Sequence, residues 1–432
     1  MISVHSVSPA LKESYAAIGN PQSVLVGLSG GADSVALLLC LCELQQGTGC
    51  RVYAVHVNHG LRDTAVRDER FCMDLCDRLN VPLVVKHVHI SQQRNIEATA
   101  REARYAAFSD VMNSCKSQVL ALAHHMDDQA ETMMLHLMHG AGLTGLAGMK
   151  MLNGQIWRPF LQVRRSQLRE YVLARGYDWC EDETNSDSAF TRNRIRMQIM
   201  PQIEACSPEA VSCMCRAARI MQSEDEYLEQ LAEKWLDKYA SKSNVAFLMS
   251  KPLTGEHVAM QRRILRKYAQ KLGMELEFDH TERLRGMLLR DKGTIENLPA
   301  SWRALKTQER LHFLHDTLEG PVVVGKFEIC AEACEAEYPL HILPASQNFD
   351  LQLRTRRAGD YIQPFGMKGT KSLKEHMIDI GMDRPFRDAW PLICRGSEVL
   401  WIVGIGASEK LRVHEGEKSL KLIYKGSLPD KI

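Results

Sequence analysis

Residues 24–44 contain the residue types of a phosphate-binding loop. We expect an apolar strand over Val24–Leu28 and an apolar helix over Ser34–Leu44. Two glycines between them permit a tight turn that exposes backbone N–H groups, and the positive end of the helix favours an anion there. The loop contains neither a GxxxxGK[ST] nor a GxGxxG pattern, which excludes a Walker A loop and a dinucleotide fold. The phosphates of a nucleotide are expected to bind Ser29, Gly30, Gly31, Ala32, Asp33 and Ser34.

A second group of polar residues runs from His124 to Thr132, where a strand gives way to a helix. Asp128 and Glu131 are three residues apart, so their carboxylates share one helix face. Acidic residues at a helix start also simply complement its dipole. Beside a phosphate loop, the same carboxylates are suited to hold Mg²⁺ or to bind an ammonium group. Consecutive residues at a strand end point to opposite faces, which argues against His124 and its neighbour His125 ligating one metal.

Three further segments carry polar residues suited to nucleotides. His56 begins the run His56–Arg62 after the second expected strand, where the base and ribose of a nucleotide rest in open α/β sheets. Arg104 lies on an expected helix, three residues after Arg101, in a pattern that is also typical of a solvated face. An acidic loop over 182–187 precedes a basic helix whose Arg192 and Arg196 share a face suited to phosphate.

Strand and helix patterns alternate from about residue 23 to residue 123, which predicts a doubly wound parallel α/β sheet. Strands are expected at Val24–Leu28, Val52–Val57, Leu83–Val88 and Val119–Ala123. Ligands of such sheets bind at the carboxyl ends of the strands. The phosphate loop and the segments His56–Arg62 and His124–Glu131 each follow a strand, so they are predicted to meet there.

The pattern changes twice further along the chain. After residue 208 it becomes helical, over Glu209–Ala240 and His257–Leu289, and from about residue 319 short β runs appear between Gly and Pro residues. We predict a catalytic domain over 1–208, a small helical domain over 209–318 and an α+β domain over 319–432. A helix over Thr191–Ile203 ends the first of these.

Composition narrows the class of protein. A formal net charge of +1 over 432 residues excludes a globally basic nucleic-acid binder, so any RNA contact must come from a local patch. The 13 cysteines include no CxxC pair, which argues against a zinc ribbon or an iron–sulfur ligand set. Neither a signal pattern nor an apolar run of about 18 residues is present, so a cytoplasmic enzyme without membrane contact is expected.

Several of these segments resemble, in order and spacing, those of the tRNA(Ile)-lysidine synthases, within the PP-loop ATP-pyrophosphatase family. The resemblance covers about residues 24–200 and rests on SGGADS, HVNHGLR, IEATAREARY, AHHMDDQAET, GAGLTGLAGM and EDETNSDSAFTRNRIR. A C-terminal segment, Arg354–Asp379, is similar to the C-terminal domain of the same enzymes. Glu183 departs from the pattern, in a loop where a shorter polar residue would be equally at home.

The resemblance implies a two-step reaction with ATP and Mg²⁺. The C2 oxygen of the wobble cytidine of CAU-anticodon tRNA(Ile) is adenylated, and L-lysine then displaces AMP to give lysidine, which changes codon recognition from AUG to AUA. The implied catalytic residues are Asp33, Arg104, His124, Asp128 and Arg196. ATP is expected at the Ser29–Ser34 loop with His56 and His124, Mg²⁺ at Asp33 and Asp128, and lysine at Asp128, Glu131 and Asn185.

A basic segment is the predicted RNA contact. The segment between Leu351 and Arg387 contains eight basic and four acidic residues, so its local net charge is +4 in a nearly neutral chain. A solvated face is the alternative, but a nucleotide-activating domain in the same chain favours RNA. The predicted tRNA-binding residues are Arg192, Arg354, Arg356, Arg357, Lys368, Lys371 and Lys374. Family members are often dimers, so a homodimer is a further expectation.

Other interpretations stay open from the sequence. A PP-loop tRNA thiolase would need a catalytic cysteine pair or an iron–sulfur cluster, and the missing CxxC counts against it. An amidotransferase or NAD synthetase would need an ammonia supply, and no glutaminase domain is evident. A module that binds ATP without turnover would give the acidic cluster no purpose. ATP–pyrophosphate exchange with tRNA would separate this module from an enzyme.

Overall fold

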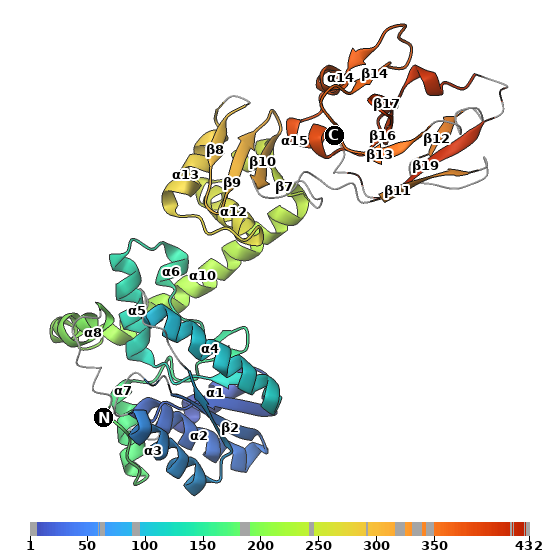
Figure 1. Ribbon diagram of the computed structural model, residues 1–432. Helices are drawn as coiled ribbons and strands as arrows, with labels where there is room; N and C mark the ends of the chain where they lie inside the picture. The colour runs from blue at the N-terminus through green and yellow to red at the C-terminus, as the bar shows by residue number, and fades with distance from the viewer. Residues whose placement is uncertain are drawn as a thin grey trace. The chain divides into compact units, whose positions relative to one another are not determined.

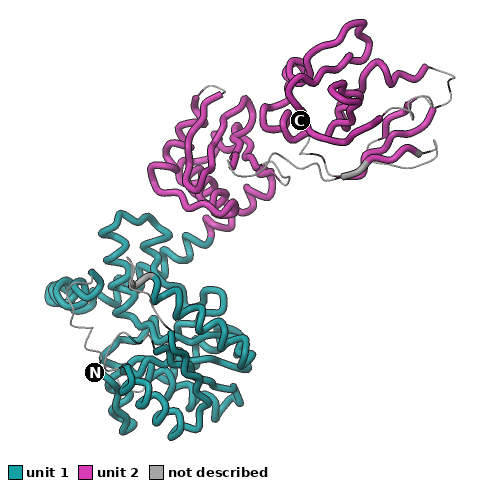
Figure 2. The backbone as a smooth tube through the Cα atoms, viewed as in Figure 1, with its two compact units in different colours: residues 1–226 teal, residues 227–432 magenta. Residues whose placement is uncertain are grey.

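The computed structural model describes most of the chain, as two compact units over residues 1–226 and 227–432 (Figure 2). The three-domain division predicted from the sequence stays a prediction. Because the placement of the units relative to each other is not determined, each is described by itself. The described residues are 7–58, 60, 65–88, 96–181, 191–241, 246–290, 293–315, 325–330, 339–342, 350–414, 417, 419–426 and 428.

The first unit is built on the predicted parallel sheet (Figure 1). Its strand order is β3-β2-β1-β4-β6-β5, and only the edge strand β5 runs antiparallel. Order reverses between β1 and β4, which is where open α/β sheets bind their ligands. The strands are β1 Ser23–Gly27, β2 Arg51–Asn58, β3 Leu83–His87, β4 Val119–Ala121, β5 Leu152–Asn153 and β6 Ile156–Trp157.

Helices cover both faces of this sheet, as the alternating pattern predicted. Successive residues of β1 point to opposite faces: Val24 and Val26 belong to one core cluster and Leu25 to another. The first cluster includes side chains of α1, α2, α3 and α7, and the second those of α4. These helices are α1 Val7–Ala17, α2 Ala32–Thr48, α3 Ala65–Leu79, α4 Ile96–Cys115 and α7 Arg165–Ala174.

The basic helix predicted over Thr191–Ile203 forms, but in three pieces. The segments are α8 Thr191–Arg194, a π-helical turn over Ile195–Ile199 and α9 Met200–Cys206. Pro201 lies in the first turn of α9 and has no N–H, so the regular hydrogen-bond pattern cannot continue through it. Before it lie α5 Met126–Met138 and α6 Leu143–Leu146.

Between residues 227 and 315 the structure adds a sheet to the predicted helices. The long helix α10 Ala210–Tyr239 contains the division between the units, and Gly273, with φ +79°, follows the end of α12. The antiparallel sheet has the order β7-β10-β9-β8. Its strands carry several charged residues, which obscured them in the sequence. The elements are β7 Ala246–Met249, α11 Ser250–Thr254, α12 Val258–Lys271, α13 Phe278–Met287, β8 Ile295–Asn297, β9 Trp302–Lys306 and β10 Arg310–His315.

The C-terminal part has the expected mixture of short strands and helices. One sheet has the order β11-β19-β12, and the other β13-β16-β17-β14-β15 with β18 beside β17. A β run expected at 322–324 lies outside the described residues. The elements are β11 Gly325–Cys330, β12 Pro339–Ile342, β13 Gln352–Arg354, β14 Tyr361–Ile362, β15 Lys371–Ser372, α14 Leu373–Asp379, α15 Arg384–Ala389, β16 Leu392–Arg395, β17 Glu398–Ile402, β18 Gly406–Ala407, η5 Glu409–Leu411 and β19 Leu420–Gly426. Of the helices described, none is long and apolar enough to cross a membrane.

Candidate active site

The loop between β1 and α2 is held by its own serines. The Ser34 hydroxyl donates to the carbonyl of Gly31 at 2.9 Å and accepts the backbone N–H of Ser29 at 3.2 Å. Gly30 has φ +88°, a conformation that side chains disfavour. Gly31 caps α2 without a side-chain hydrogen bond. The first N–H groups of this 17-residue helix therefore have no side-chain cap, as an anion-binding helix start requires.

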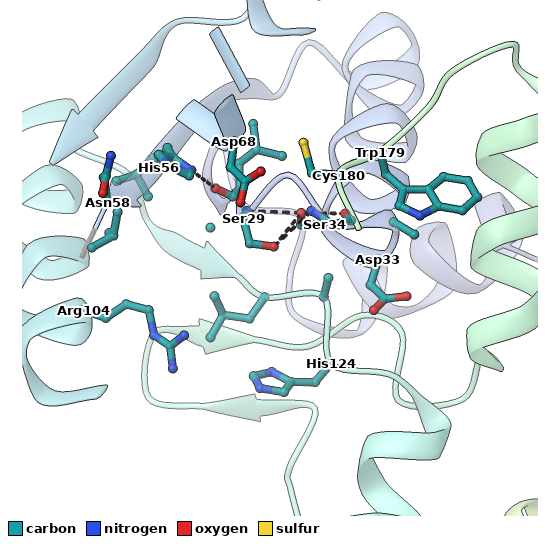
Figure 3. A pocket seen from close by; sticks show the side chains of 18 of the residues that line it. Ser29, Asp33, Ser34, His56, Asn58, Asp68, Arg104, His124, Trp179 and Cys180 are labelled. Carbon is teal, nitrogen blue, oxygen red and sulfur yellow. Dashed lines mark hydrogen bonds between the residues drawn. The ribbon is translucent and has the colours of Figure 1, made fainter. Parts of the chain in front are cut away.

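A pocket of about 440 Å³ opens over this loop (Figure 3). Arg104 and His124 face the loop from across the pocket, and His56 lies beside it, with Nδ1 2.9 Å from the carbonyl oxygen of Leu28. The structure thus brings together residues from the carboxyl ends of three strands. The predicted site residues that line the pocket are Ser29, Gly31, Ala32, Asp33, Ser34, His56, Arg104, His124, Asp128 and Arg196.

His125 organises the second polar segment, a role that the sequence analysis missed. Its ring Nδ1 accepts the backbone N–H of Asp128 at 3.2 Å, and the Asp128 carboxylate accepts the backbone N–H of His125 at 3.0 Å. The ring is buried, and its Nε2 lies 3.3 Å from Asp128 and 3.5 Å from Asp33. His125 therefore fixes the start of α5 and connects it to the phosphate loop. A polar residue three positions before an acidic one is the pattern that would have revealed this capping box.

Two arginines neutralise the acidic pair on α5. Arg196 donates Nε to Glu131 Oε1 at 2.6 Å and Nη2 to Glu131 Oε2 at 2.9 Å, and the same Nη2 lies 3.0 Å from Asp128 Oδ1. Arg192 donates to the same two residues at 3.2 Å. The sequence predicted phosphate contact for these arginines and did not anticipate their pairing with Asp128 and Glu131.

Burial and charge set the protonation of the site. Burial, with nearby Arg158, Arg192 and Arg101 outweighing the pull of Asp128, lowers the pKa of His124 to about 4. Burial opposes ionisation of Asp128, but His125 and Arg192 hold the pKa of that carboxyl below its usual range. The pocket thus presents a neutral imidazole beside an ionised carboxylate.

Asp33 is suited to a metal ion. Its Oδ1 is buried and has no hydrogen-bond partner among the described residues, although the side chain lines the pocket. No group of three or more His, Cys, Asp or Glu residues suited to a metal occurs in the described part of the chain. Mg²⁺ commonly takes one or two carboxylates and completes its shell with water and phosphate oxygens. The residues present fit that mode of binding.

Three predicted site residues are not among those that line the pocket. Gly30 belongs to the loop, Glu131 is buried behind Asp128, and Asn185 lies outside the described residues. Pocket residues that the sequence analysis did not select include Asn58, Asp68, Arg165, Arg169, Trp179 and Cys180. They come from β2, α3, α7 and the segment after α7, so their contribution depends on how these elements pack around the sheet edge, which no local pattern records.

The basic segment of the C-terminal region divides into buried and exposed residues. Arg354 is 8% exposed and forms two hydrogen bonds with Asp360, at 2.7 and 2.8 Å, so its charge is used inside the fold. Arg357, Lys368 and Lys374 are exposed, and Lys371 pairs with Asp379. A second pocket, of about 340 Å³, is lined by Arg356, Lys374, Arg384, Arg387 and Asp388.

Comparison with known proteins identifies the family. Residues 5–203 match the model of the PP-loop domain, and residues 351–424 match that of the TilS substrate C-terminal domain. The chain is 30% identical to a tRNA(Ile)-lysidine synthase of Caldanaerobacter subterraneus, over 95% of each chain. The chain belongs to the tRNA(Ile)-lysidine synthase family. Other members similar to it are those of Clostridium perfringens, 31% identical over 95% of this chain and 96% of the relative, and of Geobacter sulfurreducens, 31% identical over 93% and 92%.

Membership of this family confirms the fold and the enzyme class expected from the sequence. The match to the PP-loop domain covers the phosphate loop and the segments that begin at His56 and His124. It also covers Arg192 on α8 and Arg196 in the π-helical turn. The tRNA(Ile)-lysidine synthases therefore share with this chain the whole region that forms the pocket. The second match covers the basic segment and the strands β13 to β18 around it.

Proposed function

We propose that this chain catalyses the reaction for which its family is named. ATP adenylates the C2 oxygen of the wobble cytidine in CAU-anticodon tRNA(Ile), and diphosphate leaves. The ε-amine of L-lysine then attacks C2, the C2–O bond breaks, and AMP leaves with that oxygen. The observation that carries the proposal is the convergence of the phosphate loop, Asp33, Arg104, His124 and Asp128 on one pocket.

ATP is placed by the loop and by α2. The uncapped N–H groups at the start of α2 and the hydroxyls of Ser29 and Ser34 would hold the β- and γ-phosphates, which leave together as diphosphate. His56 follows β2 at the position expected for the nucleoside. Asp33 and Asp128 would hold Mg²⁺, which neutralises charge on the leaving group when it is bound. This arrangement assigns the loop to the leaving group rather than to the transferred AMP.

The transferred AMP meets the opposite wall of the pocket. Arg104 and Arg196 line this region and can place positive charge on the α-phosphate as attack proceeds. His124 is neutral because its pKa is about 4, so it acts as a hydrogen-bonding group and not as a cation at neutral pH. These three residues support adenylation, the first step.

The acidic pair on α5, Asp128 and Glu131, is proposed to bind lysine. Asp128 and Glu131 both form ion pairs with arginine in this structure, and their shared face is suited to an ammonium group. Asn185 is retained in this proposal from the family resemblance. Because the attacking ε-amine must be deprotonated, the carboxylates are better suited to bind the α-ammonium group than the reacting one.

The tRNA is proposed to meet the exposed basic residues of the C-terminal region. Arg354 is removed from the predicted set because it is buried against Asp360. Arg356, Arg357, Lys368, Lys371 and Lys374 remain, since their side chains are exposed or partly exposed. A cytoplasmic location and a homodimer remain expectations from the sequence.

A direct assay tests the proposed function. Purified chain, ATP, Mg²⁺ and radiolabelled lysine are mixed with the CAU-anticodon tRNA or with a matched tRNA that has uridine at the wobble position. We expect one AMP and one diphosphate for each lysine incorporated, with the cytidine substrate only. Diphosphate release without lysine incorporation, or equal use of the two tRNAs, would contradict the proposal.

A further inference from the structure

The acidic pair on α5 has no free oxygen in this structure. Glu131 Oε1 and Oε2 accept from Arg196, Oε2 also accepts from Arg192, and Asp128 Oδ1 accepts from both arginines. Asp128 Oδ2 accepts the backbone N–H of His125. An ammonium group that binds both carboxylates therefore competes with the guanidinium groups for the same oxygens.

The two arginines are held unequally. Arg196 makes two short contacts with Glu131, at 2.6 and 2.9 Å, and its side chain is 21% exposed. Burial disfavours its charge, but the hydrogen bond and charge of Glu131 raise the pKa of Arg196 above its ordinary value. Arg192 contacts the two carboxylates at 3.2 Å and the backbone carbonyl of Asp128 at 3.5 Å, and its side chain is 36% exposed. Longer bonds and greater exposure to water weaken an ion pair, so Arg192 is the one that can leave.

We propose that Arg192 selects an α-amino acid: it covers the acidic pair until an α-ammonium group displaces it, and it then binds the α-carboxylate of the same molecule. This inference rests on the proposed function, because it takes lysine as the ligand. It replaces the phosphate contact predicted for Arg192 from the sequence.

Charge balance supports the exchange. At rest, two carboxylates face two guanidinium groups. After the exchange, Asp128 and Glu131 face Arg196 and the α-ammonium group, and the released Arg192 faces the α-carboxylate. Every charge keeps a partner, which a partly buried site requires. A diamine without a carboxylate would leave Arg192 unpaired beside a second cation.

The geometry also orients the reacting amine. Asp128 and Arg196 line the nucleotide pocket, whereas Arg192 is not one of its lining residues. A ligand that takes the place of Arg192 therefore lies beside the pocket, in contact with Asp128, which lines it. The four methylene groups of lysine can carry the ε-amine past the pair toward the adenylated cytidine. Arg192 thus contributes to specificity and positioning, and not to bond making.

Steady-state competition between lysine and 1,5-diaminopentane tests this role in the full-length enzyme. Arg192→Gln removes the carboxylate partner, and Arg194→Gln on the same short helix is the matched control, because Arg194 is exposed. With intact protein we expect kcat/KM to favour lysine over the diamine by roughly ten- to a hundredfold, the size of one lost charge-assisted bond. Arg192→Gln should reduce that ratio to within about threefold of unity, and Arg194→Gln should leave it unchanged.

Further measurements separate the alternatives. Equal losses with lysine and the diamine would show that Arg192 only supports the structure, and an unchanged ratio with a raised KM for tRNA would show an RNA contact; either result overturns the inference. Thermal unfolding of Arg192→Gln and Arg194→Gln shows whether either variant has a folding defect. An Arg192→Lys variant should restore part of the preference for lysine. Failure of the proposed function would differ, since the intact enzyme would then incorporate no lysine.

Discussion

Replacement of Asp33 by asparagine should separate chemistry from RNA binding. The substitution keeps the shape of the side chain, and it weakens the 3.5 Å approach of Oδ2 to His125 Nε2. Because the buried Oδ1 has no hydrogen-bond partner among the described residues, little folded-state energy is at stake. We expect the free energy of unfolding to change by about 1 kcal/mol or less, the value of a weak ion pair.

The rate of adenylation should respond far more strongly. A preorganised electrostatic group at a transferring centre contributes about 2.7–4 kcal/mol to transition-state stabilisation, so diphosphate release should slow by roughly 10²- to 10³-fold. The affinity for tRNA should stay within about twofold, since Asp33 lies at the phosphate loop and not on the basic segment. If Asp33 holds Mg²⁺, a higher Mg²⁺ concentration should recover part of the rate.

The assay is single-turnover diphosphate release with saturating ATP and tRNA over a range of Mg²⁺ concentrations. Asp110→Asn is the matched control, because that carboxylate is on α4, 70% exposed and 4.0 Å from Lys86. A rate loss below tenfold for Asp33→Asn, or an equal loss of tRNA affinity, would refute the reasoning.

Other changes test the remaining parts. Glu131→Gln weakens three arginine contacts, so the free energy of unfolding in urea titrations should fall by roughly 1.5–3 kcal/mol. The KM for lysine should rise at least tenfold. Unchanged values of both quantities would contradict the pairing. His124 has a pKa of about 4 when folded, against 6.5 when exposed, so stability should fall between pH 6.5 and 4 and fall less in His124→Asn; equal slopes would refute this. A chain that ends at residue 318 keeps all six strands of the first sheet and should bind ATP normally by calorimetry, while binding tRNA more weakly; loss of ATP binding would contradict the predicted division.

The sequence predicted the phosphate loop and the parallel sheet well, because both depend on local patterns. The continuous apolar run of β1, buried on both faces of the sheet, and the glycine turn before α2 are each decided within a few residues. The same reasoning placed His124 and Asp128 near the loop, because parallel strands bring their carboxyl ends to one edge. Those predictions needed topology but no side-chain detail.

Contacts that depend on side-chain detail could not be predicted. The count of charges that singled out Arg354 says nothing of solvent access, and its partner Asp360 is recognisable only once β13 is folded. The divergence of neighbouring histidines argued only against a shared metal ion at His124 and His125, and the capping contact of His125 with Asp128 became visible only in the structure. The strands β9 and β10 bury the polar residues Lys306, Arg310 and His312, so their place in a sheet became visible only in the structure.

The glycine cap of α2 has a thermodynamic consequence. Relative to glycine, a serine or aspartate cap would stabilise the unliganded helix by roughly a few tenths of a kcal/mol, and Gly31 supplies no side chain for that purpose. If ATP binds here as proposed, its phosphates would accept the same N–H groups and make the contacts that a capping side chain would otherwise make. Nucleotide binding and the ordering of the loop are therefore linked, and the protein gains stability with the logarithm of ATP concentration above its dissociation constant. Substrate supply thereby sets how long the enzyme survives heat as well as how fast it works.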